Sequence, residues 1–313
     1  MNETRRALLD ELADGPVSGP TLAARLNVSR AAVWKQVEAL RREGFGIDST
    51  DEGYVVDAVP EFGASAVAYG LDADWAIEYH DSIGSTNDRG RELATSGKTE
   101  VVVLADEQTG SRGRLRREWT APSGGVWMSL VFAPDRPPAH APIYTLAAAV
   151  ATTRAAREAG VDASIKWPND LIVVDEDAPR GGWKLAGVLT EMEGEADRIS
   201  WILVGIGVNA NVDRADLPTG ATSIRAEAGD VERRLFVQRL IEEFDGLRDD
   251  PDSVLDAWRA YADTLGRRVR VETATETIEG RAVDVEFPGA LVVRTADGER
   301  TVHAGDCEHL RPV

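Results

Sequence analysis

The sequence predicts an α+β protein with an N-terminal winged helix-turn-helix, a central mixed β-sheet with helices and a small C-terminal β-barrel. Three observations support this class. Apolar residues near the N-terminus recur at three and four positions, as in helices. A long middle part mixes continuous and alternating apolar runs with helical stretches. The last part alternates apolar and polar residues between glycine turns. At 313 residues, the chain is long enough for two or three domains.

Residues 1–57 are expected to form the winged helix-turn-helix domain. A first amphipathic helix ends at Gly15-Pro16. Ser18 is expected to cap a short second helix, TLAARLN, and Ser29 to cap a longer third helix. Two helices joined by a turn of three or four residues form the helix-turn-helix pattern. The following stretch, FGIDSTDEGYVV, then supplies the two strands of a wing.

This first segment is a candidate DNA-binding domain. It carries 7 basic and 10 acidic residues, a net charge of −3, but its third helix has a local charge of +2. A helix that enters the major groove needs a positive face more than a positive domain. The alternative is a winged helix used only for packing or dimerisation. The candidate DNA-binding residues are Ser29, Arg30, Lys35 and Gln36.

Residues 58–72 are expected to be a linker, and residues 73–264 a central domain with a mixed sheet covered on one face by helices. Strands are predicted at WAIEYHDSI, EVVVLADEQ, VWMSLVFAP, DLIVVDE, KLAGVLTEME and SWILVGIGVN. Helices are predicted at Asn87–Ser96, Ile143–Ala159 and Arg233–Asp249, and around Ser253–Leu265. Residues 265–313 contain short alternating strands with turns at Gly280, Gly289 and Gly298, which predict a small SH3-like β-barrel.

The composition of the chain argues against several classes of function. A net charge of −19 argues against a general nucleic-acid coat and against anionic membranes. Only four of the 35 basic residues are lysines, a composition typical of halophilic proteins. With a single cysteine, Cys307, and no HExxH spacing, neither a disulfide nor a metal held mainly by protein side chains is expected. Without a signal peptide or an apolar run of about 18 residues, a cytoplasmic protein with no membrane partner is expected.

An arginine-rich loop is the most unusual stretch. GSRGRLRREW, residues 110–119, places four arginines within six residues of an otherwise acidic chain. Glycine lets the backbone approach a ligand closely, and arginine donates bidentate hydrogen bonds to phosphate or carboxylate. The indole of Trp119 is suited to stacking on a base. The alternative is a solvated basic loop.

Two of the four lysines precede strands in the motifs KWPND and KLAG. Pairing of those strands would bring Asp170 and Lys184 toward the same end of the sheet. Where arginine is the usual cation, a lysine suggests a compact ammonium that approaches a carboxylate oxygen. The alternative for each lysine is a simple salt bridge.

Two shorter motifs are less specific. Gly84-Ser85-Thr86-Asn87 lies between a predicted strand and a helix, where hydroxyls and helix N-terminal amides can hold a polar ring, although a helix cap would explain it. GIGVNAN, beginning at Gly205, fits a GxGxN pattern, although a turn after a strand would explain it as well.

In combination, the motifs GSTN, EQTxxRGRxxRxW, KWPND, KLAG and GxGxN resemble those of the biotin protein ligases. With the helix-turn-helix in front, the chain is similar to the bifunctional members that also repress biotin genes. The resemblance covers the whole chain and implies the class II synthetase-like biotin/lipoate ligase fold for the central domain.

The resemblance implies a two-step acyl transfer. Biotin and ATP, with Mg²⁺ on the triphosphate, would give biotinyl-5′-adenylate, and the acyl group would then pass to a lysine of a biotin carboxyl carrier protein domain. Operator DNA is a further expected partner. A homodimer is expected because paired half-sites suit a two-fold protein.

The resemblance also implies roles for individual residues. The catalytic residues would be Lys184, Arg114 and Asp170. The biotin-binding residues would be Ser85, Thr86, Asn87, Gln108, Arg112, Gly113, Arg114 and Lys184. The residues that bind ATP or the adenylate would be Arg112, Arg114, Arg117, Trp119, Lys166, Asn169 and Asn209.

Two positions depart from the family pattern. Ser111 and Arg116 stand where glycine is usual, and the bulky Arg116 could stiffen the loop or add a phosphate contact.

Three other interpretations of the function remain open: a ligase whose winged helix no longer reads DNA, a biotin-sensing DNA-binding regulator with little ligase turnover, and a lipoate-attaching ligase. The lysines and the RGR loop argue against the second of these, and the helix-turn-helix and KWPND argue against the third.

Overall fold

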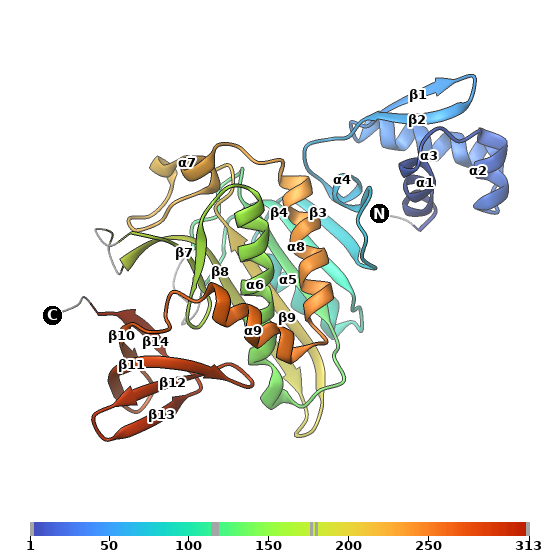
Figure 1. The fold of residues 1–313 in the computed structure, drawn as a ribbon. Helices are drawn as coiled ribbons and strands as arrows, with labels where there is room; N and C mark the ends of the chain where they lie inside the picture. Colours follow the sequence, from blue (N-terminus) through green and yellow to red (C-terminus); the bar gives the residue numbers. More distant parts are fainter. Residues whose placement is uncertain (1–2, 114–118, 176–177, 179–180, 311–313) are drawn as a thin grey trace.

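The computed structural model describes residues 3–113, 119–175, 178 and 181–310. Figure 1 shows an N-terminal unit set to one side of a large central sheet with helices, and a C-terminal sheet at the opposite end. This is the predicted α+β architecture.

The N-terminal unit is a helix-turn-helix followed by a two-stranded wing. Ser18 and Ser29 cap the second and third helices by accepting hydrogen bonds from the amides of Thr21 and Ala32, so both predicted caps are confirmed. Its leucines, together with Val33 and Val37, form a separate hydrophobic core. The elements are α1 (Glu3–Ala13), α2 (Gly19–Arg25), α3 (Arg30–Arg42), β1 (Gly46–Thr50) and β2 (Gly53–Ala58).

The segment predicted as a linker contains a helix, α4 (Ala64–Ala68), and packs on both neighbouring parts. Tyr69 meets Phe45 of the N-terminal unit edge to face, at 6.0 Å between ring centroids. Arg6 of α1 donates hydrogen bonds across the boundary to the carbonyls of Trp75 (2.9 Å) and Ala73 (3.1 Å). The N-terminal unit is therefore anchored to the central part.

The central sheet has seven strands in the order β3-β4-β5-β9-β8-β7-β6. β3 and β4 are parallel, and the other neighbours are antiparallel, which makes the sheet mixed as predicted. All six predicted central strands are present. The strands are β3 (Ala76–Ile83), β4 (Val101–Gln108), β5 (Val126–Phe132), β6 (Ala163–Lys166), β7 (Asp170–Val174), β8 (Gly182–Gly194) and β9 (Ile199–Val208).

Helices cover both faces of this sheet, so the expectation of one covered face was wrong. Val102 and Leu104 of β4 belong to the main core with α6, α8 and α9, whereas Val101 and Val103 point the other way and pack with Leu93 of α5. The helices of the central part are α5 (Thr86–Thr95), α6 (Pro142–Glu158), α7 (Ile224–Ala228), α8 (Arg233–Leu247) and α9 (Pro251–Tyr261), with 3-10 turns η2 (Pro138–His140) and η4 (Arg214–Asp216).

The C-terminal part is an antiparallel sheet in the order β13-β12-β11-β10-β14. Among the residues that the structure describes, its edge strands β13 and β14 do not pair with each other, so the predicted SH3-like barrel is not closed. Alternating apolar residues specify the inner face of such a sheet but do not specify closure. The strands are β10 (Arg268–Glu272), β11 (Thr277–Glu286), β12 (Ala290–Thr295), β13 (Gly298–Val302) and β14 (Asp306–His309).

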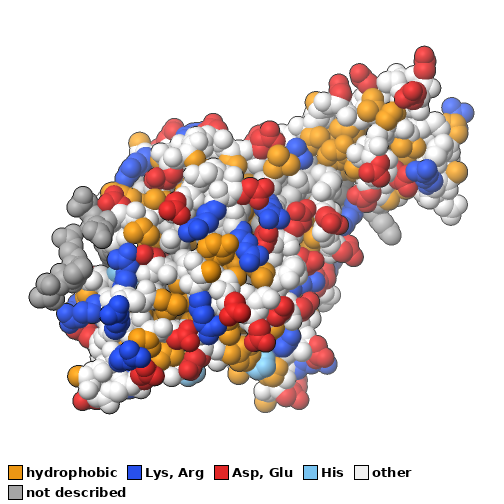
Figure 2. All heavy atoms as spheres, in the orientation of Figure 1, with side chains coloured by type: hydrophobic (Ala, Val, Ile, Leu, Met, Phe, Trp, Pro, Cys, Tyr) orange, Lys and Arg blue, Asp and Glu red, His pale blue; other side chains and the backbone are white. Residues whose placement is uncertain are grey.

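The surface carries many acidic side chains. Figure 2 shows them spread over the visible face and interspersed with basic ones. Within the described ranges, no helix combines the length and the apolar composition needed to span a bilayer.

Candidate active site

A cavity of about 430 Å³ lies over the sheet face that carries α5. It is bounded by the N-terminus of α5, the end of β4 and the middle strands β8 and β9. The structure brings ten of the predicted site residues together around it: Ser85, Thr86, Asn87, Gln108, Arg112, Gly113, Trp119, Asn169, Asp170 and Lys184.

Glycines form the floor of this cavity. Gly187 of β8 and Gly207 of β9 are paired neighbours in the sheet. A Cβ atom on Gly207 would lie 3.2 Å from Nε1 of Trp119, and one on Gly187 would lie 3.4 Å from the same indole. A Cβ on Gly205 would lie 2.2 Å from Oδ1 of Asn87. These glycines therefore leave the space that the cavity and its walls occupy.

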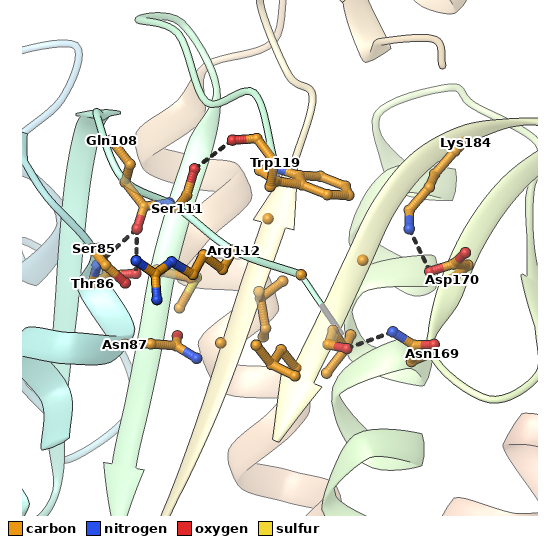
Figure 3. A pocket seen from close by; sticks show the side chains of 18 of the residues that line it. Ser85, Thr86, Asn87, Gln108, Ser111, Arg112, Trp119, Asn169, Asp170 and Lys184 are labelled. Carbon is orange, nitrogen blue, oxygen red and sulfur yellow. Dashed lines mark hydrogen bonds and ion pairs between the residues drawn. The ribbon is translucent and has the colours of Figure 1, made fainter. Parts of the chain in front are cut away.

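One end of the cavity gathers hydroxyl and amide groups, with the side chain of Arg112 beside them. Ser85 caps α5 by accepting a hydrogen bond from the amide of Asp88. The backbone amide of Thr86 donates to Oε1 of Gln108 (2.7 Å), and the hydroxyl of Thr86 lies 3.1 Å from the same oxygen. Figure 3 shows this group across the cavity from Lys184.

The other end carries a charged pair. Nζ of Lys184 lies 2.6 Å from Oδ1 of Asp170, which confirms that strand pairing brings the two together. The same ammonium lies 4.8 Å from the ring centroid of Trp119, within the range of a cation–π interaction. The arrangement places a single cation above an aromatic wall, next to a carboxylate.

Ser111 closes the base of the arginine-rich loop. Its hydroxyl donates to the carbonyl of Trp119 (2.6 Å), and the amide of Trp119 donates back to the carbonyl of Ser111 (3.3 Å). Arg112 and Gly113 line the cavity on this side. The predicted site residues Arg114 and Arg117, and the departure at Arg116, lie outside the described residues.

A second cavity of about 540 Å³ adjoins the first and reaches the C-terminal sheet. Lys166, a predicted nucleotide-binding residue, is buried at its wall. Asp306 of β14 lines both cavities, although sequence reasoning did not place it in the site. The chain separation between Asp306 and the motifs explains this omission, since no local pattern signals such a contact.

Asn209 takes a different position from the other predicted residues. It is 2% exposed, and its side-chain amide donates to the carbonyls of Thr222 (2.9 Å) and Lys184 (3.4 Å). It does not line either of the two cavities described above. Its contacts support the backbone around Lys184, and its predicted contact with adenine stays a prediction.

Cys307 of β14 lies beside Lys166 at the second cavity. Burial raises the pKa of its thiol to about 12. A thiol with a raised pKa stays protonated near pH 7, which disfavours a role as a nucleophile. Within the described ranges, no group of three or more His, Cys, Asp or Glu side chains is arranged to hold a metal ion.

The four candidate DNA-binding residues lie between the N-cap of α3 and the middle of that helix. Ser29 forms its N-cap, and Arg30 and Lys35 are exposed. Gln36 is half-buried, and its side-chain oxygen accepts a hydrogen bond from Nε of Arg5 (3.2 Å). Ser29, Arg30 and Lys35 are thus exposed, and Arg30 and Lys35 are the two of them with basic side chains.

Three family models match the chain in succession. The HTH domain model matches residues 4–55, the Biotin/lipoate A/B protein ligase family model matches residues 79–209, and the Biotin protein ligase C terminal domain model matches residues 264–310.

Curated relatives match over most of the chain. It is 35% identical to the bifunctional ligase/repressor BirA of Bacillus subtilis, over 93% of each chain. It is 31% identical to the biotin–(acetyl-CoA-carboxylase) ligase of Paracoccus denitrificans, over 71% of this chain and 95% of that one. The fold is similar to that of the biotin protein ligase from Aquifex aeolicus in complex with biotin and ATP, with a TM-score of 0.60 and 22% identity over 75% of this chain and 99% of that one.

Proposed function

The chain belongs to the biotin protein ligase family, in the form with an N-terminal helix-turn-helix, and we propose how its own residues perform the reaction. The protein is an ATP-dependent ligase that activates biotin as biotinyl-5′-adenylate and transfers it to a lysine of a biotin carrier domain. The observation that carries this conclusion is the cavity itself, which has a hydrogen-bonding end at Thr86 and Gln108 and a cation, Lys184, at the other end.

Biotin would lie along the glycine floor. Its ureido ring would meet Ser85, Thr86 and Gln108, whose polar atoms converge at the N-terminus of α5. Its carboxylate would reach Lys184 at the other end. Gly205 and Gly207 let the side chains of Asn87 and Trp119 lie close against the sheet, where they would bound the ring.

In the first step, a carboxylate oxygen of biotin attacks the α-phosphorus of ATP. The bond from that phosphorus to the bridging oxygen breaks, and pyrophosphate leaves. Two anions must meet, so a preorganised cation at Lys184 lowers the barrier. The wall of Trp119 and the charges of Arg112 and Lys166 would hold the nucleotide. Arg114 and Arg117 remain proposed phosphate contacts.

In the second step, the neutral amine of the carrier lysine attacks the acyl carbon of the adenylate. AMP leaves, and the nitrogen loses one proton. Asp170 is the proposed acceptor of this proton, because its carboxylate lines both cavities and is thus reachable from the second one. Asn169, beside it, fixes the strand end by donating to the carbonyl of Val188 (2.8 Å).

Magnesium would arrive with the triphosphate and neutralise its charge. Mg²⁺ keeps several waters and takes only one or two carboxylates beside the phosphates. The described residues fit that mode, because Asp170 and Asp306 face the cavities and do not form a dedicated three-ligand cluster.

A biotin-responsive repressor role is the proposed second activity. Arg30 and Lys35, the exposed basic residues among the candidates on α3, suit contact with operator DNA. We propose a homodimer for binding paired half-sites. The domain limits 1–57, 58–72, 73–264 and 265–313 are likewise proposed.

Replacement of Lys184 tests the ligase mechanism directly. Lys184→Ala should lower biotin transfer from ATP to a carrier domain by about a hundredfold or more, because the cation at the reacting carboxylate is removed. The measurement is incorporation of labelled biotin, with circular dichroism to verify folding. Lys98→Ala, at an exposed turn before β4, is the matched control and should keep full activity. Undiminished transfer by a folded Lys184→Ala variant would exclude Lys184 from the site.

A further inference from the structure

A row of polar side chains continues behind Thr86 and Gln108, and the proposed function does not use it. It runs through Ser129 of β5, which is fully buried, and Asn87 of α5. It ends at Glu191 of β8, whose carboxylate forms an ion pair with Arg91. The row therefore links the polar end of the cavity to a surface charge.

The ion pair fixes the orientation of the Asn87 amide. Paired with Arg91, the carboxylate of Glu191 offers only lone pairs. Nδ2 of Asn87 donates to Oε1 of Glu191 (2.9 Å). Oδ1 of Asn87 consequently faces Ser129, whose Oγ lies 2.7 Å away. Because Oδ1 can only accept, Ser129 must supply the proton of that contact.

The remaining contacts have one proton too few. Oγ of Ser129 lies 2.9 Å from Oγ1 of Thr86, which lies 3.1 Å from Oε1 of Gln108. The amide of Thr86 already donates to that Gln108 oxygen, so the Gln108 side chain cannot flip without losing this bond. Three oxygen–oxygen contacts thus share the two hydroxyl protons of Ser129 and Thr86. In one of the three contacts, therefore, two oxygens face each other with lone pairs and no proton lies between them.

We propose that Ser129 and Glu191 are positioning residues that keep the oxygens of Thr86 and Gln108 short of protons, so that the site selects a ligand ring with N–H donors. The inference rests on the proposed biotin site and explains its chemistry further. A ring N–H that donates to these oxygens relieves the lone-pair contact, whereas a ring without donors leaves it in place. The preference is set by residues that do not touch the ligand.

Glu191→Gln provides the decisive test. The new amide can donate, so Asn87 is free to flip and donate through Nδ2 to Ser129. Ser129 then donates to Thr86, and Thr86 to Gln108, and every contact has its proton. We expect isothermal titration to show biotin binding weaker by about fivefold to tenfold, with an unchanged dissociation constant for ATP and an unchanged or higher melting temperature. Lipoate, whose ring has no N–H, should not lose affinity.

Glu78→Gln is the matched control. Glu78 and Glu191 are both 30% exposed at their side chains, and each is paired with an arginine of α5, Arg89 or Arg91. Glu78 lies on β3 and has no contact with Asn87 among the described residues. Its replacement should leave biotin affinity unchanged. A purely structural role for Glu191 predicts instead a lower melting temperature with normal biotin affinity.

A double variant separates the effect of this row of polar side chains from a general loss of stability. Ser129→Ala should also weaken biotin binding, and its combination with Glu191→Gln should not be additive, because both changes interrupt the same row. Unchanged biotin affinity in Glu191→Gln, or fully additive losses in the double variant, would overturn the positioning role of Ser129 and Glu191. The ligase assignment would stay intact. A wild-type protein that binds no biotin would instead contradict the proposed function itself, and the positioning role with it.

Discussion

Glycine residues, whose side chain is a single hydrogen atom, determine how much room the active site has. Gly205 lies under Asn87, and Asn87 is held in place by Ser129 and Glu191. A side chain that is fixed on both sides cannot move away cheaply from a new methyl group. The floor is therefore sensitive to the smallest substitution available.

Gly205→Ala should raise the dissociation constant of biotin by about tenfold or more, because its Cβ would lie 2.2 Å from Oδ1 of Asn87. Titration calorimetry with biotin measures the effect. Gly246→Ala is the control, since the new methyl group would meet nothing within 4 Å in helix α8. That variant should bind biotin normally and gain about 0.5–1 kcal/mol of stability. Normal biotin binding by Gly205→Ala would contradict the assigned geometry.

At the same scale, the sequence predicts the groups that carry chemistry better than the groups that support them. Asp170 and Lys184 could be paired in advance because they occupy motifs at strand ends that must be neighbours. Ser129 and Glu191 carry no such signal. A serine in an apolar strand and a glutamate in a charged one are unremarkable until the fold brings Asn87 between them.

Among the elements, strand β14 attaches the C-terminal sheet to the central part through His309. Nε2 of this histidine lies 3.1 Å from Oγ1 of Thr264, and Nδ1 lies 3.4 Å from Asp263. Thr264 in turn accepts a hydrogen bond from the amide of Trp167 in the KWPND motif. The motif and the last described strand therefore share one buried polar cluster.

The pKa of His309 is lowered by burial, which outweighs the opposing effect of Asp263, while Lys166 and Arg267 lower it further. The unfolded chain takes up a proton below about pH 6.5, where the folded protein still excludes it, so stability falls as the pH decreases from there. Chemical denaturation should show this loss, with a slope of at most about 1.4 kcal/mol per pH unit from this group.

His309→Gln should remove that part of the pH dependence, whatever its effect at pH 8, because glutamine does not titrate. Comparison of unfolding free energies at pH 8 and pH 5.5 for the two proteins gives the result. An equally steep loss in the variant would show that other groups cause it.

Most element boundaries follow from apolar periodicity and capping residues. Ser29 and Ser85 mark helix starts correctly, and the six central strands are recognisable. The short strand β6 has only four residues and too little pattern to detect. Helix α4 lies among the small residues of a predicted linker, and its burial depends on tertiary contacts. Closure of the C-terminal sheet depends on pairing between strands, which local sequence does not encode.

For the molecule as a whole, the charge is divided unevenly. Of the total of −19, only −3 falls in residues 1–57, and the exposed side of α3 presents Arg30 and Lys35. The acidity seen in Figure 2 therefore does not exclude a DNA complex of the N-terminal unit.

Binding to the promoter of a biotin gene should weaken as KCl increases and tighten when biotin and ATP are added. Arg30→Ala and Lys35→Ala should each weaken binding and lower the slope against salt by about one if they contact phosphate. Fluorescence anisotropy with labelled DNA measures both effects, and Lys98→Ala serves as the control. Equal affinity with and without biotin and ATP would favour a ligase whose winged helix does not regulate.

The cavity gathers residues from Ser85 to Asp306, 221 positions apart in the sequence. On the ribosome, the residues at the polar end of the cavity are synthesised early, and strand β14 is translated later. Until then, the nascent protein lacks the wall that Asp306 supplies. Contacts between such distant segments also form slowly in refolding. In the order of synthesis, this wall of the site is therefore made well after the polar end.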